Sequence, residues 1–266
     1  MKIRILSAIV LIAIAIPILL VGGEVFAVFI GLLAVAGLYE LIHLRESKKE
    51  FPFMMKILAY LLVLFFTLFN FESTYFVYNV DYRVMTFIIF TFLIPIVFIN
   101  NNKKYNINDA QFLIGSTLFI GMSFNLLIIA RNFDLMYVVY LLLITTITDT
   151  FALITGRLVG KHKLAKDISP KKTIEGLIGG LIFGVVVATT FYHEVINPQV
   201  SLVILILITL CLAVVGQLGD LVFSAMKRYY NKKDFSNLIP GHGGVLDRFD
   251  SLIFVILAFI LFLNII

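Results

Sequence analysis

Long apolar runs recur along this 266-residue chain and are separated by short polar segments. Residues 5–21 and 200–219, for example, contain no charged side chain. A helix of about 20 apolar residues is long enough to cross the ~30 Å hydrocarbon core of a bilayer. The residue alternation of membrane-spanning β-strands is absent from these runs. The sequence therefore predicts an all-α, polytopic integral membrane protein with the lipid bilayer as its surroundings.

The composition agrees with this class. Hydrophobic residues make up 61% of the chain and charged residues only 14%, which is far outside the range of soluble globular proteins. A net charge of +5 could indicate a nucleic-acid ligand, but in a membrane protein the distribution of charge among the loops matters more. We expect no nucleic-acid partner. The single cysteine, Cys211, lies in an apolar run and excludes an intramolecular disulfide.

The apolar runs predict about nine transmembrane helices. They lie near residues 5–21, 25–44, 53–71, 84–99, 110–130, 135–155, 174–192, 200–219 and 245–265, and the helical period of the eighth continues to about residue 230. We expect one membrane domain over residues 1–266, in which residues 1–134 form N-terminal helices and residues 135–266 contain the polar motifs. The first run also has the form of a signal peptide, although it is long for a cleaved one.

Lys and Arg residues divide unequally between the two sides of this layout. Of the 21, only Arg83 and Arg131 fall on one side, and the other 19 fall on the opposite side. Because positive residues mark the cytoplasmic side, the N-terminus should be cytoplasmic and the C-terminus outside. The expected location is the cytoplasmic membrane, with the polar motifs on its cytoplasmic side.

One carboxylate is predicted inside a span. Asp149 lies eight residues before Arg157, which places it ~12 Å from the helix end. A carboxylate at that depth needs a partner or a water-filled cavity. The neighbouring threonines favour a polar cavity wall, and a structural ion pair or a polar contact between helices is the alternative.

Three polar residues share one face of the eighth helix, because Asp220, Ser224 and Lys227 are spaced i, i+4 and i+7. Gly216, one turn earlier, permits close helix packing. Asp220 is a ligand type that Mg²⁺ prefers, and Lys227 suits a phosphate. Headgroup anchoring would also explain Lys227 and Arg228, but it does not explain Asp220.

A glycine-rich segment precedes the last helix. Residues 240–244 read Pro-Gly-His-Gly-Gly and are followed by Asp247, Arg248 and Asp250. The helix dipole stabilises a carboxylate in a first turn by ~0.3–1 kcal/mol, so capping is one explanation of the two aspartates. The other is a Mg²⁺ site in which they join Asp220 and Asp149 as oxygen ligands. A second cation is left open.

The most basic loop, residues 161–172, ends at a helix start with Lys171, Lys172 and Thr173. Such a site suits a phosphate or an anionic headgroup, and a marker of the cytoplasmic side is the alternative. His242 either shapes its loop or binds a phosphate. The other histidines lack the spacing of zinc ligands.

Two blocks of these residues resemble the signature of phosphatidate cytidylyltransferases, also called CDP-diacylglycerol synthases. The main block fixes Ser224, Lys227, Arg228, Lys233, Asp234, Ser236, Ile239, Pro240, His242, Gly243, Gly244, Val245, Asp247, Arg248, Phe249 and Asp250. The second runs from Asp149 to Arg157 and continues through residues 160–163, 169–173 and 175–176. Together they cover roughly the C-terminal half. Phe223 departs from the pattern, because many members of the family have a Glu at this position.

The resemblance implies a metal-dependent nucleotidyltransferase that converts CTP and phosphatidate into CDP-diacylglycerol and pyrophosphate for phospholipid synthesis. It implies catalytic or metal-binding roles for Asp149, Asp220, Lys227, Arg228, Asp247 and Asp250. Substrate contacts are expected from Ser224, Lys171, Lys172, Thr173, His242, Gly243, Gly244 and Arg248, with Mg²⁺ as cofactor. A homodimer stays open. The alternatives are a cation-coupled transporter with Asp149 and Asp220 in its path, and a CTP-using lipid kinase.

Overall fold

The computed structural model describes residues 2–72, 82–99, 104–263 and 265, with side chains from Leu6 onward. Lys103 and the side chains of Lys2 and Arg4, which belong to the charge count above, lie outside this description. The chain divides into two compact units, Met1–Asn132 with Tyr230–Arg248 and Phe133–Tyr229 with Phe249–Ile266. That both act as a single membrane domain stays a prediction.

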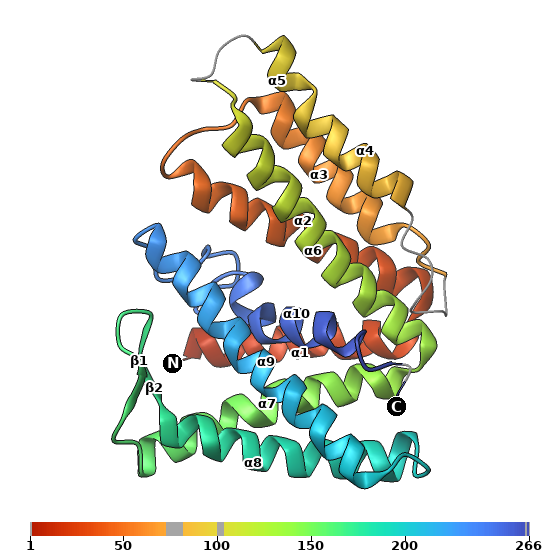
Figure 1. The fold of residues 1–266 in the computed structure, drawn as a ribbon, viewed down its shortest axis with the longest axis vertical. Helices are drawn as coiled ribbons and strands as arrows, with labels where there is room; N and C mark the ends of the chain where they lie inside the picture. The colour runs from red at the N-terminus through yellow and green to blue at the C-terminus, as the bar shows by residue number, and fades with distance from the viewer. Residues whose placement is uncertain (1, 73–81, 100–103, 264, 266) are drawn as a thin grey trace. The chain divides into compact units, whose positions relative to one another are not determined.

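The first unit is built from helices of the N-terminal half together with the segment Tyr230–Arg248. The helices are α1 (Lys2–Val21), α2 (Gly23–Glu46), α3 (Phe53–Leu68), α4 (Tyr82–Leu93), the short α5 (Pro95–Phe98) and α6 (Ile107–Phe133), as Figure 1 shows. Gly22, at φ 68°, separates α1 from α2. Arg131 of α6 donates from Nε to the carbonyl of Leu19 at 2.6 Å and from a terminal nitrogen to that of Leu20 at 2.9 Å. It therefore satisfies carbonyls at the end of α1, which have no intrahelical partner.

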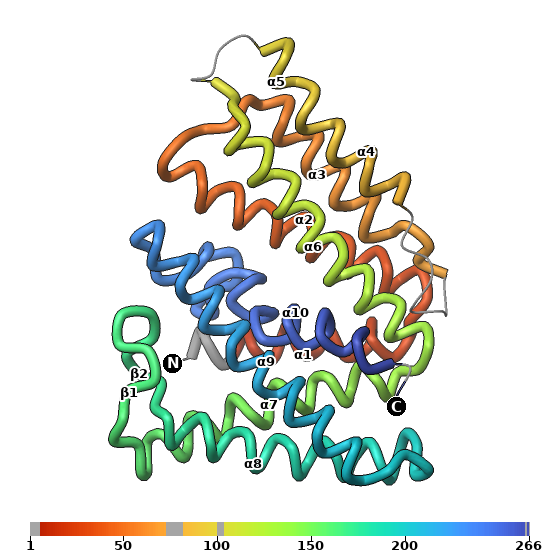
Figure 2. Tube along the Cα trace, viewed as in Figure 1, coloured from red at the N-terminus to blue at the C-terminus, as the bar shows by residue number. Residues whose placement is uncertain are grey.

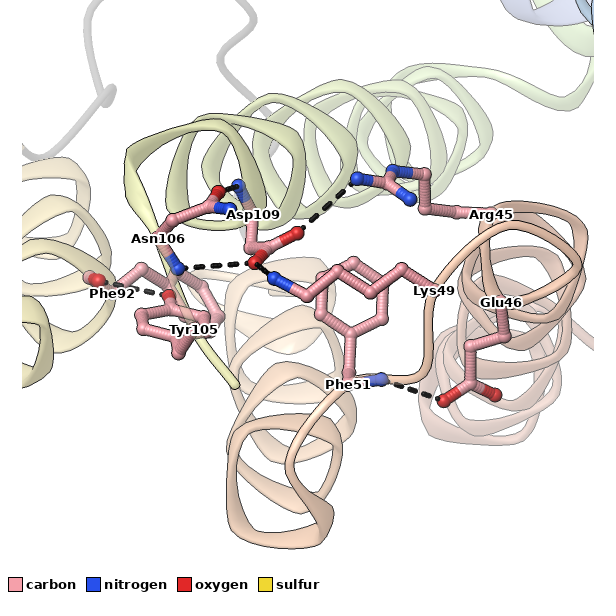
Figure 3. Close-up of polar contacts among 8 residues, drawn as sticks. All are labelled: Arg45, Glu46, Lys49, Phe51, Phe92, Tyr105, Asn106 and Asp109. Atoms are coloured by element: carbon pink, nitrogen blue, oxygen red, sulfur yellow. Dashed lines mark hydrogen bonds and ion pairs between the residues drawn. The ribbon is translucent and has the colours of Figure 1, made fainter. Parts of the chain in front are cut away.

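A buried aspartate connects α2 to α6 within the first unit (Figure 3). Asp109 is 1% exposed and forms ion pairs with Arg45, at 3.2 Å, and with Lys49. Its Oδ2 also accepts the backbone N–H of Asn106 at 3.0 Å, while Asn106 Oδ1 accepts that of Asp109 at 3.1 Å. These two cations were expected to mark the cytoplasmic side. Here they also hold α6 to the end of α2.

Tyr105 lies beside this ion pair and is fully buried. Its hydroxyl donates to the Phe92 carbonyl at 2.9 Å. Burial, together with the Asp109 carboxylate, raises the pKa of Tyr105 above its ordinary value. The hydroxyl therefore stays protonated and remains a donor at neutral pH.

The second unit contains α7 (Leu135–Leu158), strands β1 (Lys163–Ala165) and β2 (Ser169–Thr173), α8 (Ile174–Phe191), a π-helical turn η1 (Tyr192–Ile196) and α9 (Leu202–Tyr229). It also includes most of α10 (Leu246–Phe259). The sequence predicted only a loop where β1 and β2 pair as an antiparallel hairpin. The prediction that the eighth helix continues past Asp220 is confirmed by α9, whereas α10 ends earlier than residue 265.

Small residues allow these helices to pack closely. Figures 1 and 2 show α7 and α8 side by side. A Cβ added at Gly180 of α8 would lie 2.5 Å from the Thr148 carbonyl oxygen of α7. On α9, a Cβ at Gly216 would lie 2.8 Å from Val255 and one at Gly219 would lie 2.7 Å from Phe254. The prediction that Gly216 permits close helix packing is confirmed.

Within the described residues, five helices are long and apolar enough to cross a membrane, by length and composition: Gly23–Glu46, Ile107–Phe133, Leu135–Leu158, Ile174–Ile196 and Leu202–Tyr229. Shorter apolar helices cover Leu6–Val21, Phe53–Leu68 and Tyr82–Phe98. Large hydrophobic side chains on them are exposed, among them Leu6, Val28, Leu61 and Val203. Such surfaces suit lipid contact. The protein is a mostly helical polytopic membrane protein, and the count of nine spans and the sides of the termini stay predictions.

Candidate active site

A series of polar contacts connects three segments of the second unit. Lys172, in β2, places Nζ 2.6 Å from Asp220 Oδ2 of α9 and 3.3 Å from Gln217 Oε1. Gln217 Nε2 in turn donates to Asp149 Oδ1 of α7 at 2.6 Å. We call Asp149, Lys172, Gln217 and Asp220 the polar cluster. Two residues of the second sequence block, Asp149 and Lys172, therefore meet polar side chains of α9 within one unit.

Asp149 contacts polar side chains of two further helices. Besides Gln217 of α9, the hydroxyl of Ser251 in α10 lies 3.4 Å from Asp149 Oδ2. Thr145 and Thr148 line the same small space. Thr145 Oγ1, however, donates to carbonyls of the preceding turn of its own helix. Asp149 thus makes polar contacts with two neighbouring helices, which was one of the alternatives, and Gln217 connects it to Lys172. This arrangement differs from an isolated ion pair.

The predicted polar face of α9 is present. Ser224 Oγ donates to Asp220 Oδ1 at 3.3 Å. Lys227 is only 8% exposed, which disfavours the alternative that its amine anchors the helix among lipid headgroups. Arg228 is exposed, and its Nε donates to a backbone carbonyl in the turn of the β-hairpin at 3.3 Å.

Three carboxylates and two ammonium groups gather here. Asp250 of α10 experiences the like charges of Asp220 and Asp149 and the opposite charge of Lys227. The Lys172 ammonium likewise attracts the Asp149 carboxylate. Carboxylate oxygens gathered in this way are ligands of the kind that hard cations prefer.

The three residues expected at the end of the basic loop have different environments. Lys172 belongs to the polar cluster, whereas Lys171 is exposed. Thr173 is buried and caps α8, since its Oγ1 accepts the backbone N–H of Gly176 at 3.1 Å. Added Cβ atoms at Gly156 and Gly160 would collide with the Thr173 hydroxyl. The threonine thus fixes the hairpin against the end of α7.

The glycine-rich segment belongs to the first unit, where Asp247 organises it. Asp247 Oδ2 accepts the backbone N–H groups of Phe235 and Gly244, both at 2.9 Å. Gly243 has φ 85°, a conformation that side chains with a Cβ rarely adopt. The capping explanation of Asp247 therefore has direct structural support, while a role as metal ligand stays a prediction.

His242 and Arg248 help to shape the same segment. His242 Nδ1 lies 2.8 Å from Ser7 Oγ of α1. Arg248 Nε donates to the His242 carbonyl at 3.1 Å. This geometry agrees with the expectation that His242 shapes its loop.

Sequence reasoning missed two residues. Gln217 connects Asp149 to Lys172, and its amide in an otherwise apolar run was the available signal. Glu40 of α2 is fully buried, and its carboxylate accepts hydrogen bonds from Ser236, Val245 and Leu246. An acid within an apolar run was again the signal, but its partner could not be identified from the sequence.

Comparison with known proteins decides the family. The model of the cytidylyltransferase family matches residues 2–266. The chain belongs to the cytidylyltransferase family. Relatives from Staphylococcus haemolyticus, Staphylococcus saprophyticus and Staphylococcus aureus are 37%, 36% and 35% identical to it over 260, 257 and 260 residues. Each alignment covers 96% of this chain and 96% of the relative, and each relative is named phosphatidate cytidylyltransferase.

The family resemblance inferred from the two sequence blocks is confirmed, and it extends beyond them. The N-terminal half, in which only hydrophobic helices were recognisable, is included in the family match. Phe223, where many cytidylyltransferases were expected to have a Glu, is fully buried. Its ring packs edge-on against Phe254 with centroids 6.1 Å apart. At this position the present chain has an apolar contact between α9 and α10.

The family resemblance implies a Mg²⁺ ion. Among the described residues, no group of three or more His, Cys, Asp and Glu side chains is arranged to hold a metal ion together. The chemistry of the donors nevertheless fits, because Asp149, Asp220 and Asp250 offer hard oxygen ligands and influence one another electrostatically. In the structure, the positive charge beside the Asp220 carboxylate is the Lys172 ammonium. The donor atoms are therefore of the kind that Mg²⁺ takes, and the ion itself stays a prediction.

Proposed function

We propose that this protein is a phosphatidate cytidylyltransferase, which transfers the cytidylyl group of CTP to phosphatidate and yields CDP-diacylglycerol and pyrophosphate. The observation that supports this most strongly is the similarity to relatives of that name along 96% of the chain. The polar cluster adds a chemical reason. It combines carboxylates with lysines in a membrane-spanning unit, as a reaction between a lipid phosphate and a nucleotide requires.

The chemistry needs little general-base catalysis. A phosphate monoester with a second pKa near 6 is mostly dianionic at neutral pH, so it is already a nucleophile. Its oxygen forms a bond to the α-phosphorus of CTP, and the bond from that phosphorus to the oxygen bridging the α- and β-phosphates breaks, releasing pyrophosphate. The main obstacle is repulsion between two anions. We propose that Lys172 and Lys227 reduce it, with Arg228 and Arg248 as further phosphate ligands.

We propose Asp220 and Asp250 as Mg²⁺ ligands, with Asp149 and Asp247 as further candidates. When bound, Mg²⁺ would neutralise the phosphates of CTP and the developing pyrophosphate charge. Lys172 would then exchange its contact with Asp220 for a substrate phosphate. Ser224 would orient the Asp220 carboxylate, to which it already donates. A second cation stays open.

The membrane arrangement is part of the same proposal. Nine spans with a cytoplasmic N-terminus and an external C-terminus would place the basic residues beside soluble CTP. Phosphatidate would enter sideways from the cytoplasmic leaflet of the cell membrane. A homodimer is compatible with this arrangement and is left open.

The decisive experiment follows the label from CTP. Detergent-purified protein is incubated with phosphatidate, Mg²⁺ and CTP labelled at either the α- or the γ-phosphate. Appearance of α-label in the lipid and of γ-label in pyrophosphate is the expected result. γ-Label in the lipid would instead identify a lipid kinase, and no transfer to any of several lipid acceptors would favour the cation-coupled transporter.

A matched pair of variants tests whether this activity depends on the polar cluster. Asp220→Asn should reduce transfer by at least about 100-fold, because it removes the charge that faces Lys172. Asp167→Asn, an exposed residue in the turn between β1 and β2, should leave transfer unchanged. Equal activity of the two variants would contradict the proposed site.

A further inference from the structure

Glu40 lies in the C-terminal half of α2 and is fully buried, although its side chain is a carboxylic acid. Its two oxygens accept hydrogen bonds from the segment Tyr230–Arg248 of the same unit. Oε1 accepts the Ser236 hydroxyl at 2.6 Å and the Val245 backbone N–H at 2.8 Å. Oε2 accepts the Leu246 backbone N–H at 2.8 Å. Burial of a carboxylate is unfavourable unless such hydrogen bonds satisfy it.

The two backbone donors belong to the start of α10. The first N–H groups of a helix have no intrahelical acceptor, and the positive end of the helix dipole favours an anion there. Caps normally come from the same chain segment. Here the cap of α10 comes from α2, about 200 residues earlier, as the sequence separations of 205 and 206 residues show.

Ser236 fixes the other end of the same loop. Because Ser236 and Val245 bind one carboxylate oxygen, Glu40 holds both ends of residues 236–245 to a single point on α2. Gly244 is necessary for this close approach, since a Cβ at that position would collide with the Glu40 carboxylate. Asp247 also holds this segment, through the Phe235 and Gly244 N–H groups.

We infer that Glu40 is a positioning residue for cytidylyl transfer, which holds the segment with Gly243, Gly244, Asp247 and Arg248 in its active shape. The inference rests on the proposed function, and it assigns Glu40 no contact with CTP or phosphatidate. Glu40 acts through the loop. Its loss should therefore reduce kcat more than it changes KM, because the loop residues remain present but lose their fixed geometry.

The test compares Glu40→Gln with Glu46→Gln in the full-length, detergent-purified protein. Both substitutions remove an acid from α2. Glu46, however, contacts Lys56 and the Phe51 backbone, whereas the Ser236, Val245 and Leu246 donors bond to Glu40. In Glu40→Gln an amide NH₂ group replaces one of the two carboxylate oxygens. Both oxygens accept hydrogen bonds in the unchanged protein, whereas an NH₂ group is a donor. Two quantities are measured: hydrogen exchange of peptides covering residues 236–249, and kcat and KM with CTP and phosphatidate.

For Glu40→Gln we expect about 10-fold faster exchange in residues 236–249 and a kcat about 10-fold lower or more, with KM changed less than about 3-fold. Glu46→Gln should leave both quantities as in the unchanged protein. Faster exchange with an unchanged kcat would overturn the inference, as would unchanged exchange. If Glu40→Gln does not fold, Ser236→Ala, which removes one of the three donors, must give the same two effects in weaker form.

The outcomes also separate this inference from the proposed function. Hydrogen exchange reports on the contact between Glu40 and the loop whether or not CTP is a substrate. A protein that transfers no label from CTP would overturn the function, even if exchange changes as expected. A protein that transfers label normally after Glu40→Gln would overturn only the positioning role.

Discussion

The Lys172 ammonium lies 2.6 Å from the Asp220 carboxylate, which joins strand β2 to the middle of α9. Sequence reasoning assigned Lys172 to a phosphate and Asp220 to a metal ion. Both assignments stay predictions. In the structure each residue neutralises the other, and in the proposed reaction Lys172 would turn to the anionic substrate when Asp220 binds the cation. This exchange of partners would couple substrate binding to cation binding.

Removal of the Lys172 charge should therefore impair catalysis. We expect Lys172→Met to lower kcat/KM by at least about 100-fold, since a phosphate loses its cation and Asp220 keeps an uncompensated charge. Lys172→Arg keeps the charge and should retain more activity than Lys172→Met. Lys166→Met, an exposed residue of the hairpin, is the control and should behave as the unchanged protein. Full activity of Lys172→Met would remove Lys172 from the site.

Asp247→Asn separates capping from metal binding. The asparagine keeps an oxygen that can accept the Phe235 and Gly244 N–H groups but loses the negative charge. If Asp247 is a ligand, turnover should be abolished while expression and thermal stability stay near normal. Substantial residual activity would show that Asp247 serves only to cap and shape the segment.

Gln217→Leu tests the connection between Asp149 and Lys172. Loss of the amide leaves Asp149 Oδ1 without its 2.6 Å donor, which should cost about 1–3 kcal/mol of stability and at least about 10-fold in kcat. Thermal unfolding in detergent and steady-state kinetics measure the two effects. A variant that is as stable and as active as the parent protein would contradict the importance of this connection.

Asp109→Asn should affect stability without a direct effect on catalysis. Asp109 is 1% exposed and pairs with Arg45 and Lys49, so its neutralisation leaves two partly buried cations without their counter-ion. We expect a lower unfolding temperature and a normal kcat at a temperature where the variant is folded. Glu50→Gln, an exposed neighbour, should change neither. A selective loss of kcat would assign the Asp109 cluster a part in catalysis.

Metal dependence can be measured directly. Chelation by EDTA should abolish label transfer, and added Mg²⁺ should restore it. Asp250→Asn should raise the Mg²⁺ concentration that gives half-maximal activity, because the variant removes a proposed oxygen ligand. An unchanged Mg²⁺ dependence, or full activity in EDTA, would exclude this assignment.

The helical positions could be predicted from the sequence because they depend on local composition. Apolar runs must form helices in a bilayer, where every backbone hydrogen bond has to be made internally. The face that contains Asp220 and Ser224 was predictable for the same reason, since helical period alone fixes it. The hairpin formed by β1 and β2 was missed, because such short polar strands have no marked alternation of apolar residues.

Length, hydrophobicity and the spacing of two motifs were enough to predict a helical membrane protein and its family. Only the tertiary structure revealed that Gln217 connects Asp149 to Lys172 and that Glu40 caps α10. Each of these contacts joins residues many positions apart, and an isolated acid or amide in an apolar run does not identify its partner. The helical repeat determines which side of a helix a residue occupies, whereas packing between helices decides which residue it contacts there.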